Sequence, residues 1–460
     1  MPQLRFLGLR LGAMKRTAFQ WLVISSLLTT VIVPAQGRTR PRYGGSLRVE
    51  VSGSLWDPDG IARRLTTETL THVDEQGRVQ PWLATKWESQ NRDKRWVFTI
   101  RPGLKFHDGT PVTAYAIAQI LNGCAGCPWK TAAAAGEDLV FDMDTPSPLF
   151  PAQVALPHFG IAKGGTGGAP IGTGPMRVTQ STPTSATLTA FDNYWNGHSL
   201  LETVEVTASR KLRDQWLDLG VGRADVAEVA AEQVRRAQQE QLRVVTSRND
   251  ELIALVMNDA SSTMQNANLR EAVAASVDRA SLLNVIFQRQ GELAGGLLPN
   301  WLSGYAAALS SAQNLSRAKE LRAQLGQPPT LTLTYDANDA ALQLVAERIA
   351  LSAREAGITI RTVPAPAHWD LTISRVRLSS FNPSVALEDL VSTIGLEHRT
   401  PDDVSTESQF QRERELLKSN RLVPLLYVPH GFAAGERVHS WKLDEGGLPD
   451  FDEIWTEVRR

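Results

Sequence analysis

Residues 71–114 read THVDEQGRVQPWLATKWESQNRDKRWVFTIRPGLKFHDGTPVTA, and they constrain the fold more than any other stretch of this 460-residue chain. Apolar side chains alternate along Arg95–Ile100, with Trp96 and Phe98 on one side, which predicts a strand with one buried face. Lys86–Glu88 is the expected partner strand, because the polar SQNRDK between them is typical of a hairpin turn. The opening half of the block is therefore predicted to be a β-hairpin.

The end of the block, LKFHDGTPVTA, raises a question about chemistry, because His107 and Asp108 are adjacent. Asp-Gly favours a tight turn, and Thr113 is a good N-cap for a helix over 114–121. Side chains of neighbours on a turn point apart, and the chain carries no GxSxG, HExxH or P-loop pattern. We interpret His107–Asp108 as a structural corner and predict no catalytic residue here.

The composition indicates a soluble globular protein of two or three domains. Apolar residues make up 42% and charged residues 21%, and the net charge of −1 provides no strong field for nucleic acid. We therefore predict no nucleic-acid partner. Trp is frequent, with 12 copies against 6 Tyr, and its flat faces suit both cores and binding clefts.

The N-terminus has the pattern of a secretory signal peptide over residues 1–35. Four basic residues (Arg5, Arg10, Lys15 and Arg16) precede the apolar run 21–33, and Val33-Pro34-Ala35 is a suitable cleavage site. Translation could instead start at Met14, and an uncleaved membrane anchor is the alternative reading of the apolar run. We expect export into a periplasm.

The two cysteines of the chain lie in GCAGCPWK as Cys124 and Cys127. A CxxC pair can be a redox pair, half of a zinc site or a local disulfide. No second CxxC or close His pair accompanies it, and it follows an expected helix end rather than a strand. We favour a disulfide that closes a loop, and we predict no metal and no cofactor.

The middle and late chain mixes strands and helices. We predict a strand over 251–258 and a long helix over 268–290 that begins at Asn268. Strand 330–335, helix 340–356 and strand 358–363 form a β-α-β unit whose strands should be parallel. The glycine-rich run 164–175 lacks a lysine and a following helix, so we interpret it as a flexible crossing between domains.

Several blocks together resemble one known family. They are YGGSLRV, the block 71–114, IGTGPMRV, FDNYWNGHSLLETVEV, LVMNDASSTMQNANLREAVAASVDRASLL and VPLLYVPHGF, in this order. With these blocks the chain resembles the family 5 extracellular solute-binding proteins, the dipeptide, oligopeptide and nickel-binding class of ABC importers. The resemblance covers nearly all of residues 43–460.

The resemblance implies an α/β fold of the two-lobed periplasmic binding protein type (type II-like), with an extra domain on the first lobe. Lobe 1 is expected to comprise 43–75, 172–258 and 423–460, the extra domain 76–171 and lobe 2 259–422. The ligand would lie between the lobes, and closure would present both lobes to the transmembrane subunits of an ABC permease. We expect a monomer that binds a small molecule or peptide.

The chain departs from the family where peptide binders carry an Asp for the amino group of the ligand. The matching stretch here is SSFNP, with Ser379 in place of that Asp and Asn382 in place of a later acid. Arg375 and Arg377 lie just upstream on one strand face, where either could meet an anion. The alternative is that both lie on a solvated edge.

Three tryptophans are candidates for the cleft, namely Trp56, Trp301 and Trp369. Each could instead belong to a hydrophobic core. The site predicted from sequence thus comprises these three residues with Arg375, Arg377, Ser379 and Asn382.

We consider three functions. The first is the periplasmic binding component of an ABC importer, which does no covalent chemistry. The second is a secreted sensor or scaffold with the same fold and no transport role. The third, a hydrolase, requires a nucleophile and base that the sequence does not show.

Overall fold

The computed structural model describes residues 43–124, 127–165, 168–326, 329–396, 403–444 and 446–457. The expected signal peptide lies outside the described residues. Arg42–Arg460 forms one compact unit. Within the described ranges, no helix is both long enough and apolar enough to cross a membrane.

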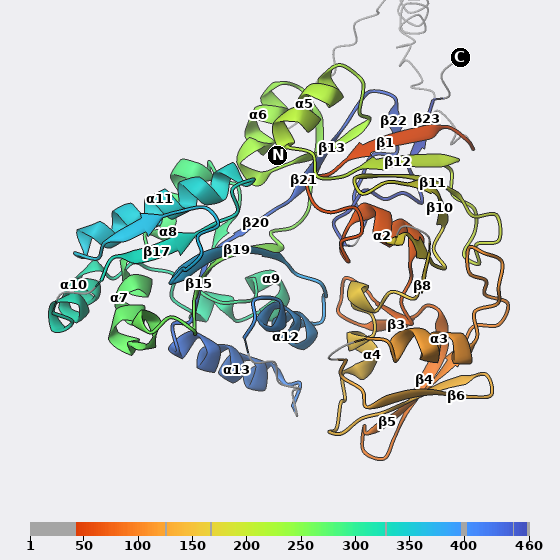
Figure 1. Ribbon diagram of the computed structural model, residues 1–460, viewed down its shortest axis with the longest axis horizontal. Coiled ribbons are helices and arrows are strands. Elements are labelled where there is room, and N and C mark those ends of the chain that lie inside the picture. Colours follow the sequence, from red (N-terminus) through yellow and green to blue (C-terminus); the bar gives the residue numbers. More distant parts are fainter. Residues whose placement is uncertain are drawn as a thin grey trace, which may run out of the picture. The chain divides into compact units, whose positions relative to one another are not determined.

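The first large sheet has seven strands among the described residues, and it contains both early and late parts of the chain (Figure 1). Its order is β10 (Met176–Ser181), β11 (Ser185–Ala190), β12 (Thr203–Thr207), β1 (Ser46–Glu50), β13 (Val226–Val229), β21 (Gly431–Ala434) and β14 (Arg243–Thr246). Strand β1 pairs in parallel with β12 and β13. Its helices are α2 (Ile61–Thr66), α5 (Leu212–Gly220) and α6 (Val234–Gln239).

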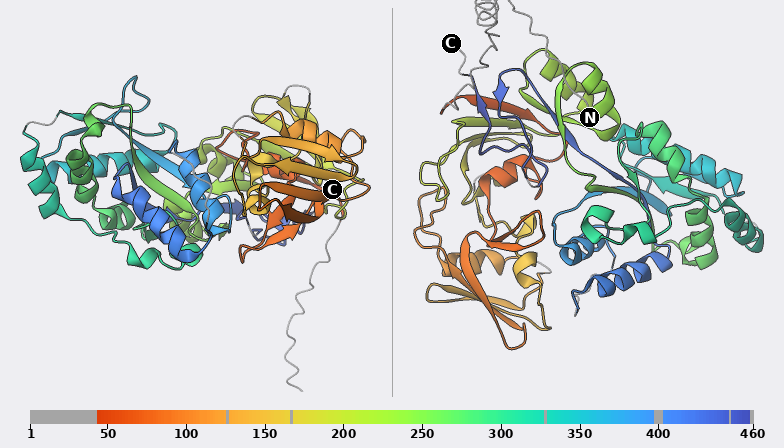
Figure 2. Two further views of the ribbon diagram at one scale, coloured as in Figure 1. Left: turned by 90° about the horizontal axis from the view of Figure 1, so that it is seen from below. Right: turned by 180° about the vertical axis from the view of Figure 1, so that it is seen from behind.

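The second large sheet has six described strands. Its order is β16 (Glu292–Leu293), β20 (Leu422–Val428), β15 (Glu251–Met257), β19 (Leu371–Arg377), β17 (Leu331–Thr334) and β18 (Ile360–Thr362). One face packs against α7 (Ala267–Ser276), α10 (Leu315–Gln324) and α11 (Ala340–Glu355), and the other against α12 (Pro383–Thr393) and α13 (Thr406–Lys418) (Figure 2). Because both faces are covered, β15 and β20 are buried along their whole length.

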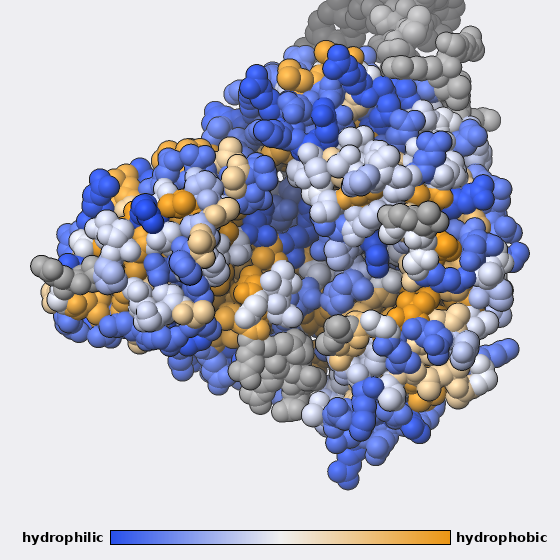
Figure 3. Space-filling model, viewed as in Figure 1, coloured by the Kyte–Doolittle hydropathy of each residue, from blue (hydrophilic) through white to orange (hydrophobic). Residues whose placement is uncertain are grey.

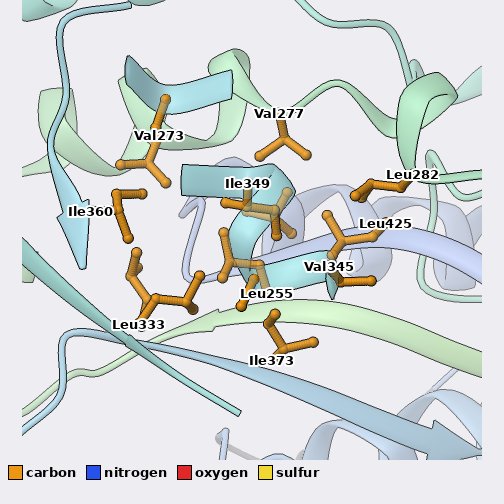
Figure 4. Close-up of a cluster of buried hydrophobic side chains, with 14 of the residues drawn as sticks. Leu255, Val273, Val277, Leu282, Leu333, Val345, Ile349, Ile360, Ile373 and Leu425 are labelled. Carbon is orange, nitrogen blue, oxygen red and sulfur yellow. The ribbon is translucent and has the colours of Figure 1, made fainter. Parts of the chain in front are cut away.

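The predicted β-α-β unit is confirmed in this second sheet. Strands β17 and β18 pair in parallel, and α11 connects them. The carboxylate of Asp339 caps α11 by accepting hydrogen bonds from the amides of Ala341 and Leu342. Val345 and Ile349 of α11 are fully buried in the largest apolar cluster of the unit, which Figure 4 shows.

A smaller four-stranded sheet lies within the expected extra domain. Its order is β4 (Ala84–Gln90), β5 (Arg95–Ile100), β7 (Asp138–Asp142) and β6 (Thr131–Ala135), with α3 (Ala114–Leu121) and α4 (Phe150–Gln153) beside it. The β4–β5 hairpin is confirmed, and its turn uses positive φ angles at residues 91–93. The cap of α3 is also as predicted, because Thr113 accepts a hydrogen bond from the amide of Ala116.

Short two-stranded pairs complete the described strands. They are β2 (Thr71–Val73) with β3 (Val79–Pro81), β8 (Lys163–Gly164) with β9 (Pro170–Ile171), and β22 (Val438–His439) with β23 (Trp455–Thr456). The pair β2–β3 spans residue 76, which was the expected start of the extra domain.

His107 and Asp108 form the predicted corner, and their side chains bind different partners. The His107 Nε2 lies 3.0 Å from the Gly174 carbonyl oxygen, and its Nδ1 accepts from the Gly172 amide. Burial lowers the pKa of His107 to about 4, so the ring is neutral at physiological pH. Asp108 instead pairs with Lys163 at 2.8 Å.

We expected the glycines at 172–174 to make the crossing flexible, but the structure shows a different role for them. A Cβ on Gly172 would lie 1.9 Å from the Thr66 carbonyl oxygen, and one on Gly174 would lie 2.5 Å from that of Leu65. The glycines are required because two backbones pack directly against each other here. His107 then holds the crossing in place.

The prediction of one long helix over 268–290 is wrong in its extent. Helix α7 ends at Ser276, Val277 is extended, and a short helix α8 (Arg279–Ser281) and a π-turn over Leu282–Ile286 follow. The break occurs because Asp278 caps a new helix by accepting from the Ser281 amide. The first cap is Asn266 rather than Asn268.

Strands β15 and β20 lie at the expected lobe boundaries of 258 and 423, and they pair with each other in the six-stranded sheet. The chain crosses between the large sheets at residues 247–250 and 429–430. A continuous apolar run predicts a buried strand but does not say which sheet receives it.

Cys124 and Cys127 are joined by a disulfide in the structure. The pair follows the end of α3, as the sequence predicted.

Candidate ligand-binding cleft

The two crossings between the large sheets lie side by side and bond to each other. Ser247, after β14, donates its amide hydrogen to the carbonyl oxygen of His430 at 2.9 Å, just before β21. Two short adjacent connections of this kind are the usual structure of a hinge, because few residues need to change their dihedral angles. We call residues 247–250 and 429–430 the hinge.

A buried histidine ties the hinge together. The Nδ1 of His430 lies 2.9 Å from the Ser247 Oγ and 3.1 Å from the Asp250 Oδ1, while its Nε2 faces the carbonyl oxygen of Gly447. A Ser-His-Asp relay places serine and aspartate on opposite ring nitrogens. Here they share one nitrogen, so this cluster has the geometry of a structural tie.

A cavity of about 80 Å³ lies beside the hinge, and we call it the central cavity. Three groups of residues line it. The first is Asp59, Arg64, Gly446 and Leu448, and the second is His72, Val73, Ala155 and Pro157. The third is Asp250, Trp301, Arg377, Leu378, Ser379, Ser380 and Phe381. In the space-filling view the surface is hollowed between elements of the two large sheets (Figure 3). The first group of lining residues belongs to the part of the protein around the seven-stranded sheet, and the third group belongs to the part around the six-stranded sheet.

A second cavity of about 740 Å³ adjoins the first, and we call it the side cavity. The two share six lining residues: Arg64, His72, Ala155, Pro157, Gly446 and Leu448. The side cavity adds Glu68, Trp82, Tyr194 and Phe451, among others. Ligand sites for small organic molecules measure about 300–1,000 Å³. The joined cavities therefore have room for such a ligand, and the central cavity alone does not.

Arg375 and Arg377 lie on one face of β19, as their spacing predicted, and both contact Glu251 of the neighbouring strand at 3.3 Å. Arg375 also lies 3.1 Å from Asp339. Burial would raise the pKa of Glu251, but the charges of Arg377 and Arg375 outweigh burial and lower it. Strand β19 lies between β15 and β17, so the reading of a solvated edge is wrong, and both guanidinium groups already have anionic partners.

The stretch that departs from the family pattern forms part of the cavity wall. Ser379 lines the central cavity and donates its hydroxyl hydrogen to Asp389. Asn382 caps α12 by accepting from the amide of Val385 at 3.2 Å, so its side chain serves the helix. Between them, Phe381 lines the cavity with its ring centroid 5.9 Å from that of Trp301.

The three candidate tryptophans lie in different places. Trp301 lines the central cavity and donates its indole hydrogen to the carbonyl oxygen of Asn249 in the hinge. Trp56 packs against the apolar core of the seven-stranded sheet. Trp369 precedes β19, roughly 25 Å of extended chain from Arg377 at the other end of that strand. Only Trp301 of the three is brought to this cavity.

Contacts across the cavity join the extra domain to the six-stranded side. A Cβ on Gly77 would lie 2.8 Å from the Phe381 carbonyl oxygen, and next to it Glu75 of the β2–β3 turn pairs with Arg248 of the hinge at 3.1 Å. Val385 of α12 is buried in the apolar cluster of the extra domain. The extra domain and the six-stranded side are therefore in contact next to the central cavity.

Sequence reasoning missed Asp59, which lies in the loop between β1 and α2. Asp59 is an exposed residue at the cavity, where the surrounding protein partly desolvates its carboxyl and raises its pKa, and the positive charges of Arg377 and Arg64 act in the opposite direction. A signal was available, because the loop 51–60 follows the carboxyl end of β1, which pairs in parallel with both neighbours. Ligands of α/β sheets commonly bind at that end of the strands.

Sequence reasoning also missed Glu68 in the side cavity. Its carboxylate is buried and accepts hydrogen bonds from the Tyr194 hydroxyl at 2.9 Å and the Trp195 indole at 3.1 Å. Burial raises its pKa to about 7 against these hydrogen bonds. Among the described residues, no group of three or more His, Cys, Asp or Glu side chains is arranged to hold a metal ion.

The sequence comparison identifies the family. Residues 78–384 match the family model of bacterial extracellular solute-binding proteins, family 5. The match covers about two thirds of the chain, and the chain belongs to this family.

Two relatives from Escherichia coli match the chain at low sequence identity. The probable D,D-dipeptide-binding periplasmic protein DdpA of Escherichia coli (strain K12) is 24% identical over 311 residues, which are 62% of this chain and 60% of the relative. The nickel-binding periplasmic protein of the same organism is 23% identical over 405 residues, 77% of this chain and 75% of the relative. The matches thus span about three fifths to three quarters of these relatives.

The fold is shared with a solved structure. NikA from Staphylococcus aureus in complex with Ni(L-His)2 superposes with a TM-score of 0.77 at 19% identity, covering 90% of this chain and 100% of that one. The likeness confirms the predicted two-lobed α/β fold.

Proposed function

We propose that this protein is the periplasmic substrate-binding component of an ABC importer. It captures a small solute, peptide-like or another organic molecule, between its two lobes and delivers it to a membrane permease. The observation that carries the proposal is the position of the joined cavities, whose walls come from both large sheets beside a two-crossing hinge. Family membership supports the same reading.

The proposed mechanism is a change in the population of open and closed states. Ligand binding stabilises the closed state by as much as it binds that state more tightly than the open one. The closed protein then presents both lobes to the transmembrane subunits. In this proposal the exported protein works in the periplasm as a monomer, needs no cofactor and leaves the ligand chemically unchanged.

The proposed ligand contacts in the central cavity are Trp301, Arg377, Ser379 and Phe381. The proposal leaves out Trp56, which packs against a core, Trp369, which precedes the far end of β19, and Asn382, which caps α12. Arg375 is also left out, because it is not among the residues that line the central cavity and Glu251 and Asp339 hold its guanidinium group. The names of the relatives given above refer to different solutes, so the ligand class of this protein has to be inferred from the residues that line the cavity.

Thermal-shift screening of the mature protein tests the proposal. The panel should contain peptides, sugars, metal ions and small anions and cations, with chemical analysis of each hit after incubation. A ligand at a hundred times its dissociation constant stabilises the folded state by about 2.7 kcal/mol, which raises the melting temperature by several degrees. Turnover of the hit, or no hit in the whole panel, would contradict the proposal.

A matched pair of variants locates the binding site. Trp301→Ala should weaken binding of the hit, because the ring lines the cavity. Trp216→Ala should leave binding unchanged, because Trp216 packs with the separate apolar cluster of α5 and α6 and donates to Glu240.

A further inference from the structure

The positive charges that line the joined cavities are already neutralised. Arg64 pairs with Asp444 at 3.1 Å, Arg377 with Glu251 at 3.3 Å, and Arg78 of the side cavity with Asp74 at 2.8 Å. A paired guanidinium group offers little free charge to an anionic ligand. The lining therefore has no cation left to anchor an anion among its described arginines.

Some of the negative charges in the lining have no cationic partner. Among the described residues, the Asp59 carboxylate has neither a hydrogen bond nor an ion pair, although Arg377, Arg64 and His158 lie near enough to influence it. The carboxylate of Asp452, in the side cavity, also lacks an ion pair within the described chain. Glu68 is bonded only by neutral donors. Asp59 and Asp452 thus carry negative charge without an ion pair among the described residues, whereas Glu68, whose pKa is about 7, is only partly charged at neutral pH.

Aromatic faces lie in both cavities. Trp301 and Phe381 line the central cavity, and Trp82 and Tyr194 line the side cavity. Such faces attract cations through their quadrupole. The Arg248 guanidinium lies 5.4 Å from the centre of the Trp301 ring, so one cation of the chain already lies beside this ring.

The unpaired carboxylates and the aromatic walls point to the same ligand chemistry. We propose that the joined cavities bind an organic cation, a protonated amine or a guanidinium compound, with Asp59 as its counterion and the side cavity around the rest of the molecule. This inference rests on the proposed function and specifies its substrate class. Asp59 belongs to the seven-stranded side and faces Trp301 and Ser379 of the six-stranded side, so a cation held by Asp59 would bridge the two lobes.

Binding measurements with matched probe pairs test the inference. The cationic probes are putrescine and agmatine, and Ala-Phe is a zwitterion that carries a charged amino group. Their counterparts are 1,4-butanediol, which replaces the amino groups of putrescine by hydroxyls, succinate, an anion with a four-carbon chain, and N-acetyl-Ala-Phe, which lacks the charged amino group of Ala-Phe. We expect at least one cationic probe to raise the melting temperature and bind by calorimetry, while its counterpart does neither.

Variants of Asp59 assign the counterion. Asp59→Asn should weaken binding of the cationic probe at least tenfold, and Asp59→Glu should restore part of the affinity. Asp144→Asn should leave the affinity unchanged, because that side chain is 77% exposed and lies outside the cavities. If Asp59→Asn does not fold, Asp59→Ser in the same loop replaces it.

The outcomes separate this inference from the proposed function. Stabilisation by the uncharged or anionic probes alone would overturn the inference and leave the proposed function intact. Unchanged binding of the cation to Asp59→Asn would overturn the role of Asp59. No stabilisation by any of the six probes at 10 mM would overturn the inference, while the broader panel described above decides the proposed function.

Discussion

The two halves of strand β19 face the same side of one sheet and meet opposite environments. Leu371 and Ile373 are buried in the apolar cluster under α11. Arg375 and Arg377 continue the same alternation and end in ion pairs with Glu251 beside the cavity. The first half of β19 thus belongs to the apolar core and the second half to the cleft. The surroundings change from apolar to charged between Ile373 and Arg375.

The difference shows how the fold carries a charged site at small cost to its stability. The apolar half supplies stabilisation through burial and close packing. The charged half contributes little net stability, because desolvation of the ions offsets their attraction, but removing one partner leaves a buried charge uncompensated. The following changes test this contrast, from the largest expected effect to the smallest.

Ile349→Ala should destabilise the protein most. Ile349 of α11 is fully buried, and its truncation leaves a cavity that the surrounding side chains fill only in part. We expect a loss of about 4 kcal/mol in the free energy of unfolding, measured with urea. Leu344→Ala on the same helix is the control, because Leu344 is 50% exposed and should lose less than about 0.5 kcal/mol. Equal losses at the two positions would contradict the packing described here.

Glu251→Gln should cost about 3 kcal/mol, because two partly buried guanidinium groups lose their shared counterion. The same urea experiment on Glu205→Gln, an exposed residue of β12, should show almost no change. A neutral effect of Glu251→Gln would mean that water already screens this cluster.

Glu68 should make stability fall as the pH rises through neutrality. Its folded pKa of about 7 lies above the ordinary value of 4.5, so between these pH values the folded state holds more protons than the unfolded state. The stabilisation is complete below pH 4.5 and is lost as the pH rises through 7. We expect a loss of about 2 kcal/mol between pH 5 and pH 8 that Glu68→Gln abolishes.

His107 changes the pH dependence of the stability in the opposite direction, so it serves as a control for the Glu68 experiment. Its folded pKa of about 4 lies below the ordinary 6.5, so its contribution is complete above pH 6.5 and is lost as the pH falls toward 4. His107→Asn should reduce this acid-side slope and keep ligand binding. A pH profile that is identical in wild type and Glu68→Gln would show that Glu68 is not buried as described.

The smallest effect on stability is expected from two glycines with matched backbones. Gly77 has φ +76° and faces the Phe381 carbonyl across the cavity, whereas Gly136 has φ +68° and no atom within 4 Å. Both Ala variants should lose about 1 kcal/mol through backbone strain. Only Gly77→Ala should also weaken ligand binding, because its methyl group obstructs closure. Equal affinities would show that this contact does not form when ligand binds.

Local features of the sequence predicted much of the fold. The alternation in β5, the Thr113 cap and the β17–α11–β18 unit each depend on neighbouring residues, and the structure confirms them. The break after Ser276 was missed because Asp278 can both continue a helix and cap a new one.

The site was harder to predict, because its contacts join distant parts of the chain. The shared strand face of Arg375 and Arg377 followed from a spacing of two, but their partner Glu251 lies more than 120 residues earlier. Asp59 has no local signal that marks it as a cavity residue, because the cavity forms only where loops of both large sheets meet. Local patterns indicate faces and caps, and only the tertiary structure shows which charges remain unpaired.

The central claim is that two lobes close over a trapped ligand, and small-angle X-ray scattering tests it most directly. The mature protein should be measured with and without a saturating amount of the ligand that stabilises it, together with Gly77→Ala. The account predicts that ligand decreases the radius of gyration of the wild-type protein, and decreases it less for the variant at equal ligand concentration. An unchanged radius of gyration in wild-type protein shown by calorimetry to be saturated would contradict the account.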